Sequence, residues 1–266
     1  MTELSNLYPQ LHQLLKDLAK MGVDKPFIGY GNPNADILII GQECALVEGS
    51  LDYNQFYRPN YKQWEDSFNG HGFTYKHGIQ PYSFENKAFH PIYPFYLQDN
   101  KKAICGSTYM YYQKLIDEIR SVIYNTEYER SNKITFFKDC FITELSDICM
   151  PNHNETPLEE QKKIRKLIEE HIRIRFEWMR KTDFFKHFKV VVLACGPYAN
   201  AIKKDDVLKK DLFGNAEVFY CNQLSRWDKK HLEENSNEIG IIKSIAKIKP
   251  RVSSKQDLDI IVNTVV

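Results

Sequence analysis

The chain lacks any long uninterrupted run of apolar residues. No run reaches the roughly 18 residues that a membrane-spanning helix needs, and Met1–Lys20 shows no basic segment followed by an apolar core. It also lacks an excess of charge, since 36 Lys and Arg face 35 Asp and Glu for a formal net charge of +1. We therefore expect no membrane partner, and this balance excludes a histone-like binder that depends on net charge alone.

The six cysteines lack the spacing of a metal centre. They are spread from Cys44 to Cys221 without a Cys-x-x-Cys pair, and the eight histidines are equally dispersed. Zinc and iron–sulfur sites use closely spaced ligands, so the spacing predicts neither a metal nor another cofactor. Free thiols in apolar segments are typical of a reducing compartment, which favours a cytoplasmic location.

The 266 residues, 42% of them hydrophobic, suffice for the core of one large α/β domain. Aromatic residues are unevenly placed, because Tyr53–Tyr112 holds 17 of the 35. Either this segment packs a small core of its own or its rings surround a ligand pocket. Residues 42–102 otherwise show little periodicity, which predicts a long irregular connection.

Four short apolar runs predict the strands of a parallel sheet, because continuous apolar runs suit strands that are buried on both faces. The runs are Ala35–Ile40, Ile134–Thr143, Val190–Ala194 and Glu217–Cys221. Segments with helical spacing separate them, which indicates βαβ units with right-handed crossovers. We find no internal repeat and no low-complexity linker, so a single domain is favoured.

Helical periodicity predicts a first helix over residues 4–21 and a last one over 232–246. One face of the first carries five leucines, and Gly22 is its stop signal; the leucines are Leu7, Leu11, Leu14, Leu15 and Leu18. A further helix is predicted over 108–123, with Val122 on its buried face. Thr156 and Glu159 have the spacing of a capping box that opens a helix running to about Lys181.

Polar segments follow three of the predicted strands at the points where the strands end. They are Gly41–Cys44, Thr143–Asp147 and Cys221–Arg226. Ligands of open parallel sheets bind outside the carboxyl ends of the strands, so we expect these segments to come together around a site.

Residues 31–43 read Gly-Asn-Pro-Asn-Ala-Asp-Ile-Leu-Ile-Ile-Gly-Gln-Glu. This stretch resembles the uracil-DNA glycosylase superfamily, whose members commonly have a Gly-Asn-Pro-like turn, an apolar strand and then Gly-Glu-Ala-Pro-Gly or Gly-Gln-Asp-Pro-Tyr-His. Val190–Gly196 resembles the family's strand-to-Gly step, and Phe219–Arg226 resembles its strand ending in His-Pro-Ser. The resemblance implies a three-layer α/β/α sandwich with a central four-stranded parallel sheet, as one domain over 1–266 with its core at about 27–235.

The resemblance also implies a function. Such a protein is a monomeric DNA base-excision hydrolase, which flips uracil or another deaminated or modified base out of DNA and cleaves its N-glycosidic bond. The sugar becomes oxocarbenium-like, so a carboxylate is needed to activate water, and donors are needed for the departing base. This chemistry needs no metal, and the iron–sulfur cysteine pattern of some members is absent.

The catalytic candidates follow from the matched motifs. Glu43 takes the place of the family's water-activating aspartate, and Gln42 is positioned to contact the base or the water. Glu144 lies where Asn commonly reads the base edge. Asn222 and Gln223 are the remaining donors at the strand end, because Gln-Leu-Ser replaces His-Pro-Ser.

The binding candidates surround these residues. Ser146 follows Glu144 in the same polar segment, and Ser225 and Arg226 are candidates to grip a phosphate. The base-stacking ring is expected among the aromatic side chains Tyr53, Phe56, Tyr57 and Phe73.

Two other functions stay open at this point. The missing His, the carboxylate of Glu144 and the neutral charge favour a catalytically degenerate protein that binds a nucleotide or a modified base on the same fold. A hydrolase of a small nucleoside is the second alternative, since it needs no affinity for DNA.

Overall fold

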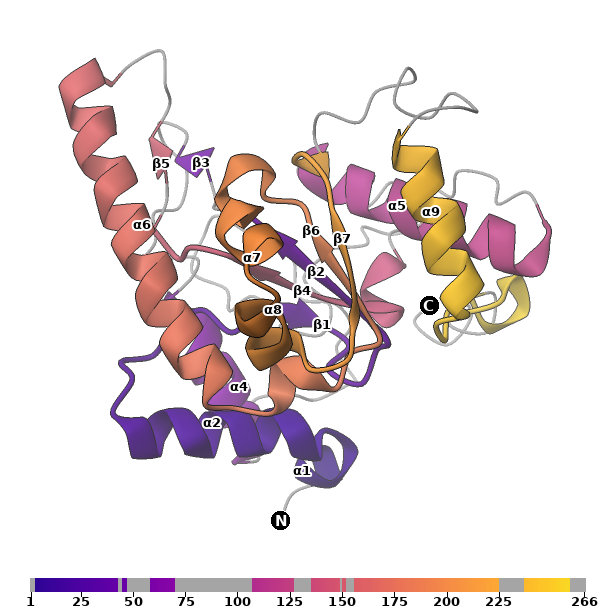
Figure 1. The fold of residues 1–266 in the computed structure, drawn as a ribbon. Coiled ribbons are helices and arrows are strands. Elements are labelled where there is room, and N and C mark those ends of the chain that lie inside the picture. Colours follow the sequence, from indigo (N-terminus) through magenta and orange to yellow (C-terminus); the bar gives the residue numbers. More distant parts are fainter. Residues whose placement is uncertain are drawn as a thin grey trace.

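The computed structural model describes residues 3–42, 45–46, 58–69, 107–126, 135–148, 150–151, 156–224 and 237–258. At its centre lies a five-stranded sheet in the order β1-β4-β2-β6-β7. The strands are β1 (Tyr30–Gly31), β2 (Ile37–Gly41), β4 (Cys140–Glu144), β6 (Val190–Leu193) and β7 (Glu217–Tyr220). Helices cover both faces of this sheet (Figure 1).

Four strands of the sheet are parallel, as the apolar runs predict. β2 pairs in parallel with β4 and β6, and β6 pairs in parallel with β7. The sequence did not indicate β1, which pairs antiparallel with β4, because two residues carry no periodicity. The strand predicted within Ile134–Thr143 begins only at Cys140, because Phe136–Lys138 forms the 3₁₀ helix η2.

The strands are buried on both faces by two separate cores. Leu38 and Ile40 of β2 pack on one face, and Ile37 and Ile39 pack on the other. The first face is covered by α2 (Pro9–Met21), α6 (Leu158–Arg180) and α8 (Asp206–Phe213). The second is covered by α5 (Ser107–Tyr124) and α9 (Asn237–Ile248). The α/β class predicted from the sequence is therefore confirmed.

The predicted N-terminal helix is divided into α1 (Glu3–Leu7) and α2. Pro9 occupies the first turn of α2, where its missing N–H costs no hydrogen bond. Four of the five predicted leucines are buried, but Leu7 lies in α1 and its exposed fraction is 47%. Gly22 ends α2 in a left-handed conformation, as predicted.

The prediction of an irregular connection is wrong for part of its length, because α4 (Arg58–Phe68) lies within it. Trp64 is completely buried in the first core, together with Tyr61 and Phe68. Asn60 accepts hydrogen bonds from the backbone N–H groups of Ile28 and Gly29. These aromatic rings therefore serve packing, the first of the two roles that composition left open.

The start of α6 also differs from its prediction. The N-cap position is Pro157, and no side-chain hydrogen bond caps this helix. The prediction of a capping box formed by Thr156 and Glu159 is thus wrong. Instead, Gln161 donates a hydrogen bond from Nε2 to the Thr156 carbonyl over 2.8 Å. Val122 of α5 was expected to be buried and is instead 45% exposed.

Smaller elements connect the main ones. η3 (Phe184–Lys186) precedes β6, and η4 (Gly196–Ala199) with α7 (Asn200–Lys204) follows it. β3 (Ala45–Leu46) and β5 (Met150–Pro151) form a separate two-stranded parallel sheet.

The segment after α9 is fixed to the start of β2 by a buried carboxylate. Asp36 is 4% exposed and accepts hydrogen bonds from Arg251 Nε at 2.9 Å and from Lys189 Nζ at 2.8 Å. Burial raises the pKa of the Asp36 carboxyl, but the hydrogen bonds from Arg251 and Lys189 outweigh burial, so its pKa lies below the ordinary 3.8.

This depressed pKa predicts a pH dependence of stability. A group with a lowered folded-state pKa contributes stability above its unfolded pKa and loses it as the pH falls through the folded value. The free energy of unfolding of wild type should therefore exceed that of Asp36→Asn at pH 7, and the gap should narrow below about pH 4. Urea unfolding of both proteins at several pH values tests this, and a gap independent of pH would contradict it.

Candidate functional site

The strand order defines one place where a ligand crevice is expected. β2 and β6 are neighbours in the sheet. From β2 the chain goes on to β4 on one side of this pair, and from β6 it goes on to β7 on the opposite side. The carboxyl ends of β2 and β6 are therefore a topological switch point, where open α/β sheets bind their ligands. The residues that follow there are Gln42 after β2 and Cys195 with Gly196 after β6.

The chain segments after β2 and β4 run side by side beyond the sheet. Leu145 N donates to Gly41 O over 2.8 Å, and Ser146 N donates to Gln42 O over 3.0 Å. Further along, β3 pairs with β5, Ala45 lying opposite Met150. The structure therefore brings two of the three predicted polar segments side by side at the carboxyl edge.

Glu144 places its carboxylate against Gly41. These residues are partners in the β2–β4 register, and a Cβ atom at position 41 would collide with the Glu144 carboxylate. Glu144 is half-buried, and Gln42 beside it is half-buried too. The Glu144 carboxylate thus packs over the end of β2 at the carboxyl edge, with Gln42 next along the chain, and only glycine at position 41 leaves room for this placement.

Ser146 has a different environment. Its side chain is completely buried, and its hydroxyl accepts a hydrogen bond from Ile148 N over 3.0 Å. This arrangement is a local turn that positions the residues around it.

The other part of the carboxyl edge is formed at the ends of β6 and β7. Cys195 is buried and donates from Sγ to Ile40 O over 3.1 Å. Gly196 N donates to Cys221 O over 3.2 Å, in a left-handed backbone conformation with φ of 53°. Burial raises the pKa of the Cys221 thiol to about 12, so this thiol stays protonated and unreactive at neutral pH.

Asn222 and Gln223 follow β7 on this side. Asn222 is exposed, and its Oδ1 lies 3.7 Å from the position that a Cβ of Gly196 would take. Gln223 is half-buried. Because β4 and β7 are three strand spacings of about 4.8 Å apart, Asn222 and Glu144 lie at opposite ends of the edge. The expectation that all three segments meet at one point is therefore too simple.

Seven of the predicted site residues lie outside the described residues. They are Glu43, Tyr53, Phe56, Tyr57, Phe73, Ser225 and Arg226.

Two polar residues of α6 that the sequence patterns did not indicate reach this region. His171 Nδ1 lies 3.1 Å from Asp147 Oδ1, in the turn after β4. Arg175 donates to Thr143 Oγ1 over 2.6 Å and to Phe27 O over 2.8 Å. A signal existed, because both residues fall near the buried positions Ile168 and Ile172 on the inward side of the helix, where polar side chains need partners.

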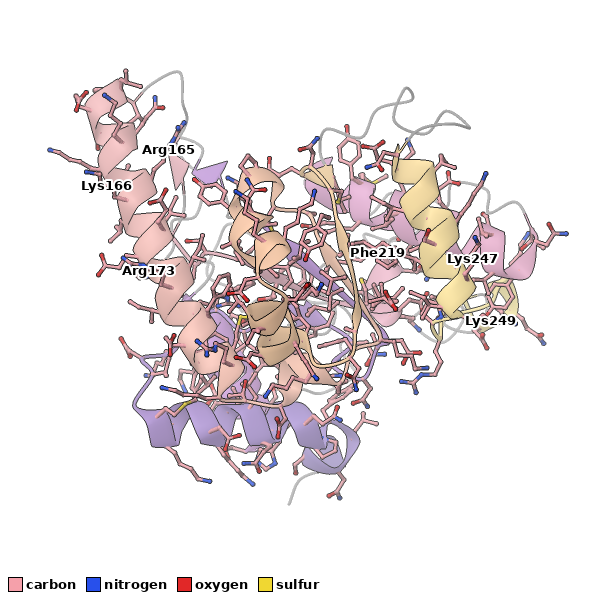
Figure 2. The ribbon with its side chains drawn as sticks, in the orientation of Figure 1. Arg165, Lys166, Arg173, Phe219, Lys247 and Lys249 are labelled. Carbon is pink, nitrogen blue, oxygen red and sulfur yellow. The ribbon has the colours of Figure 1, made fainter. Side chains whose placement is uncertain are left out.

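Several cations lie on the surface of two helices. Figure 2 shows Arg165, Lys166 and Arg173 along α6 and Lys247 with Lys249 at the end of α9. None of them forms an ion pair with another residue that the structure describes. The N-terminal half of α6 projects past the sheet beside β3 and β5, so its cations lie on the side of the carboxyl edge (Figure 1).

A cavity of about 350 Å³ lies elsewhere, between α2 and η3. It is on the amino side of the sheet, because η3 precedes β6. Its polar groups bond to one another, as Gln13 donates to Asp17 over 2.8 Å and Lys186 to Asp183 over 3.3 Å. Several polar side chains of this cavity are therefore engaged with one another.

Within the described ranges, no group of three or more His, Cys, Asp or Glu side chains is arranged to hold a metal ion. In the same ranges, no helix has both the length and the apolar character needed to cross a membrane.

Fold and site together define an α/β protein with a mostly parallel sheet, whose carboxyl edge carries a carboxylate, amides and an Asp–His pair. Neither a family model nor a curated protein matches the chain.

Proposed function

We propose that the protein is a DNA base-excision hydrolase that cleaves the N-glycosidic bond of uracil or of another deaminated or modified base. The observation that carries this proposal is the carboxylate of Glu144, at the end of β4, which packs against Gly41 at the carboxyl end of β2. The residues from position 31 through this point are the ones that resemble the uracil-DNA glycosylase superfamily. A parallel sheet with helices on both faces is also the architecture that the resemblance implies.

The chemistry of the reaction fits this set of side chains. Positive charge develops on the sugar as the bond breaks, and carboxylates at the edge stabilise it. We assign water activation to Glu43, which directly follows Gln42, and contact with the base to Gln42 and Glu144. An ionised carboxylate only accepts hydrogen bonds, so Glu144 favours a base edge that presents N–H groups.

The surroundings of the edge support a nucleic-acid ligand. Arg165 and Lys166, on the N-terminal half of α6, form no ion pair with another described residue and offer sites for backbone phosphates. The net charge of +1 predicts that binding depends on this local surface and weakens steeply with salt. We assign the remaining phosphate contact to Ser225 and Arg226, and base stacking to one of Tyr53, Phe56, Tyr57 and Phe73.

A panel of oligonucleotides tests the function. Each single- and double-stranded DNA carries one uracil, hypoxanthine, xanthine or other modified base, and released base is quantified by chromatography. We expect wild type to release at least one base and Glu43→Ala to be at least about 100-fold slower. Glu170→Gln on the exposed side of α6 is the matched control and should keep the wild-type rate. Release of no base from any DNA would contradict the proposal.

A second function is favoured by one observation: Gln223-Leu224-Ser225 stands where the family has His-Pro-Ser, so the histidine of that motif is replaced by an amide. A protein that binds a modified base without cleaving it would show salt-dependent DNA binding and no release in the same panel. Turnover of free nucleosides without DNA affinity would indicate a small-molecule hydrolase instead.

A further inference from the structure

A carboxylate–imidazole pair lies beside the candidate site. Asp147 is in the turn after β4, three residues beyond Glu144, and its Oδ1 lies 3.1 Å from His171 Nδ1 on α6. The Asp147 side chain is 14% exposed and the His171 side chain 36% exposed. The carboxylate is therefore largely withdrawn from water, while the imidazole remains accessible.

The pair is placed next to the segment that follows β2. Ser146, the neighbour of Asp147, donates its N–H to Gln42 O, and Met150 lies opposite Ala45 in the β3–β5 pairing. Asp147 thus lies between two points where its turn contacts the chain after β2. The chain after β4 therefore leads directly from Glu144 to the pair.

The geometry selects one ring nitrogen for chemistry. An ionised Asp147 accepts the proton of Nδ1, which fixes the imidazole and leaves Nε2 to exchange a proton. No described residue forms a hydrogen bond with Nε2. A carboxylate that orients an imidazole through one nitrogen while the other reacts is a general arrangement for acid–base catalysis.

We propose that Asp147 and His171 are the proton-donating pair of this site, with His171 Nε2 giving its proton to the departing base. This inference rests on the proposed base-excision function. It assigns to α6 the imidazole role of the family's His-Pro-Ser motif, where this chain has Gln223.

The proton and electron balance of the step is complete. The C1′–N bond breaks with its electron pair going to the base nitrogen, and the base takes the proton from His171 Nε2. Water forms the new bond to C1′ and loses one proton to the carboxylate assigned to Glu43. Glu43 then releases its proton to solvent and solvent returns one to Nε2, so that the sum is substrate plus water giving free base and sugar hydroxyl.

The test compares two leaving groups in single-turnover reactions. Identical oligonucleotides carry either uracil or 5-fluorouracil, whose anion leaves more readily and needs protonation less. We expect His171→Ala to slow uracil release about 100-fold and 5-fluorouracil release much less. Added imidazole should restore part of the uracil rate, and Asp147→Asn should show a smaller loss with the same preference for 5-fluorouracil.

The controls separate this role from a structural one. His12→Ala on α2 removes another half-buried imidazole, one that stacks on Phe68. This variant should release uracil and 5-fluorouracil at the wild-type rates, and added imidazole should not change either rate. Equal losses for both bases in His171→Ala, without rescue, would assign the pair to tying α6 to its turn and overturn the proposal. An unchanged rate in His171→Ala would overturn it as well. Wild-type protein that releases neither base would overturn the proposed function for these substrates, and the role of the pair with it.

Discussion

Replacing Arg120 with methionine should lower the free energy of unfolding by about 3–5 kcal/mol, because it leaves two carboxylates without their counter-ion. Arg120 is completely buried between α5 and η2. Its Nη1 lies 2.8 Å from Asp117 Oδ1, and its Nε lies 2.7 Å from Asp139 Oδ2. Burial raises the pKa of Asp117 despite the opposing contacts from Gln113 and Arg120, so this carboxylate depends on its partners.

Urea unfolding measures the effect of this substitution. Arg165→Met on the exposed side of α6 is the matched control and should change the free energy of unfolding by less than about 0.5 kcal/mol. Arg120→Met combined with Asp139→Leu should cost less than the sum of its two single changes, because no unpaired charge remains at that position. A loss below about 1 kcal/mol for Arg120→Met would contradict the importance of the buried network.

Replacing Gly41 with alanine should lower base release at least about 100-fold while the fold is retained. The new Cβ would take the space of the Glu144 carboxylate, which is the flexible end of a side chain and can move away. The backbone of Gly41 is not in the left-handed region, so alanine introduces no strain there. Activity should therefore fall through the displaced carboxylate, with little effect on stability.

Gly240→Ala is the matched control for this prediction. Gly240 lies within α9, and a Cβ at this position would meet no atom within 4 Å. Base release should be unchanged, and the free energy of unfolding should rise by at most about 1 kcal/mol, since alanine favours a helix. Wild-type release rates in Gly41→Ala, confirmed as folded by thermal unfolding, would show that the position of Glu144 against Gly41 is not needed.

The two large predictions concern opposite parts of the sheet. Arg120 and its carboxylates lie near the start of β4, where Asp139 also accepts hydrogen bonds from Ser253 N and Oγ. Gly41 and Glu144 lie at the carboxyl ends of β2 and β4. The polar groups that stabilise the fold are thus separate from those assigned to the proposed chemistry. A variant of Arg120 should therefore not alter the Gly41–Glu144 contact, and a variant of Gly41 should not alter the Arg120 network.

The sequence by itself determined the α/β class and the four parallel strands. Each apolar run is a local pattern, and burial on both faces of a sheet requires it whatever the neighbouring strands are. The strand-end rule then located Gln42 and Glu144, because the end of an apolar run can be read directly from the residues.

The tertiary structure decided the strand order, the helix α4 and every polar pairing across the fold. Asp147 and its partner His171 are 24 positions apart in the sequence, and Asp36 and its partner Arg251 are 215 positions apart. The residues around each carboxylate give no indication of which side chain it contacts. Such contacts depend on which helix packs over which strand end, and residue spacing along the chain contains no such information. For this reason the sequence predicted the edge on which the site lies, while only the fold brought an imidazole to it.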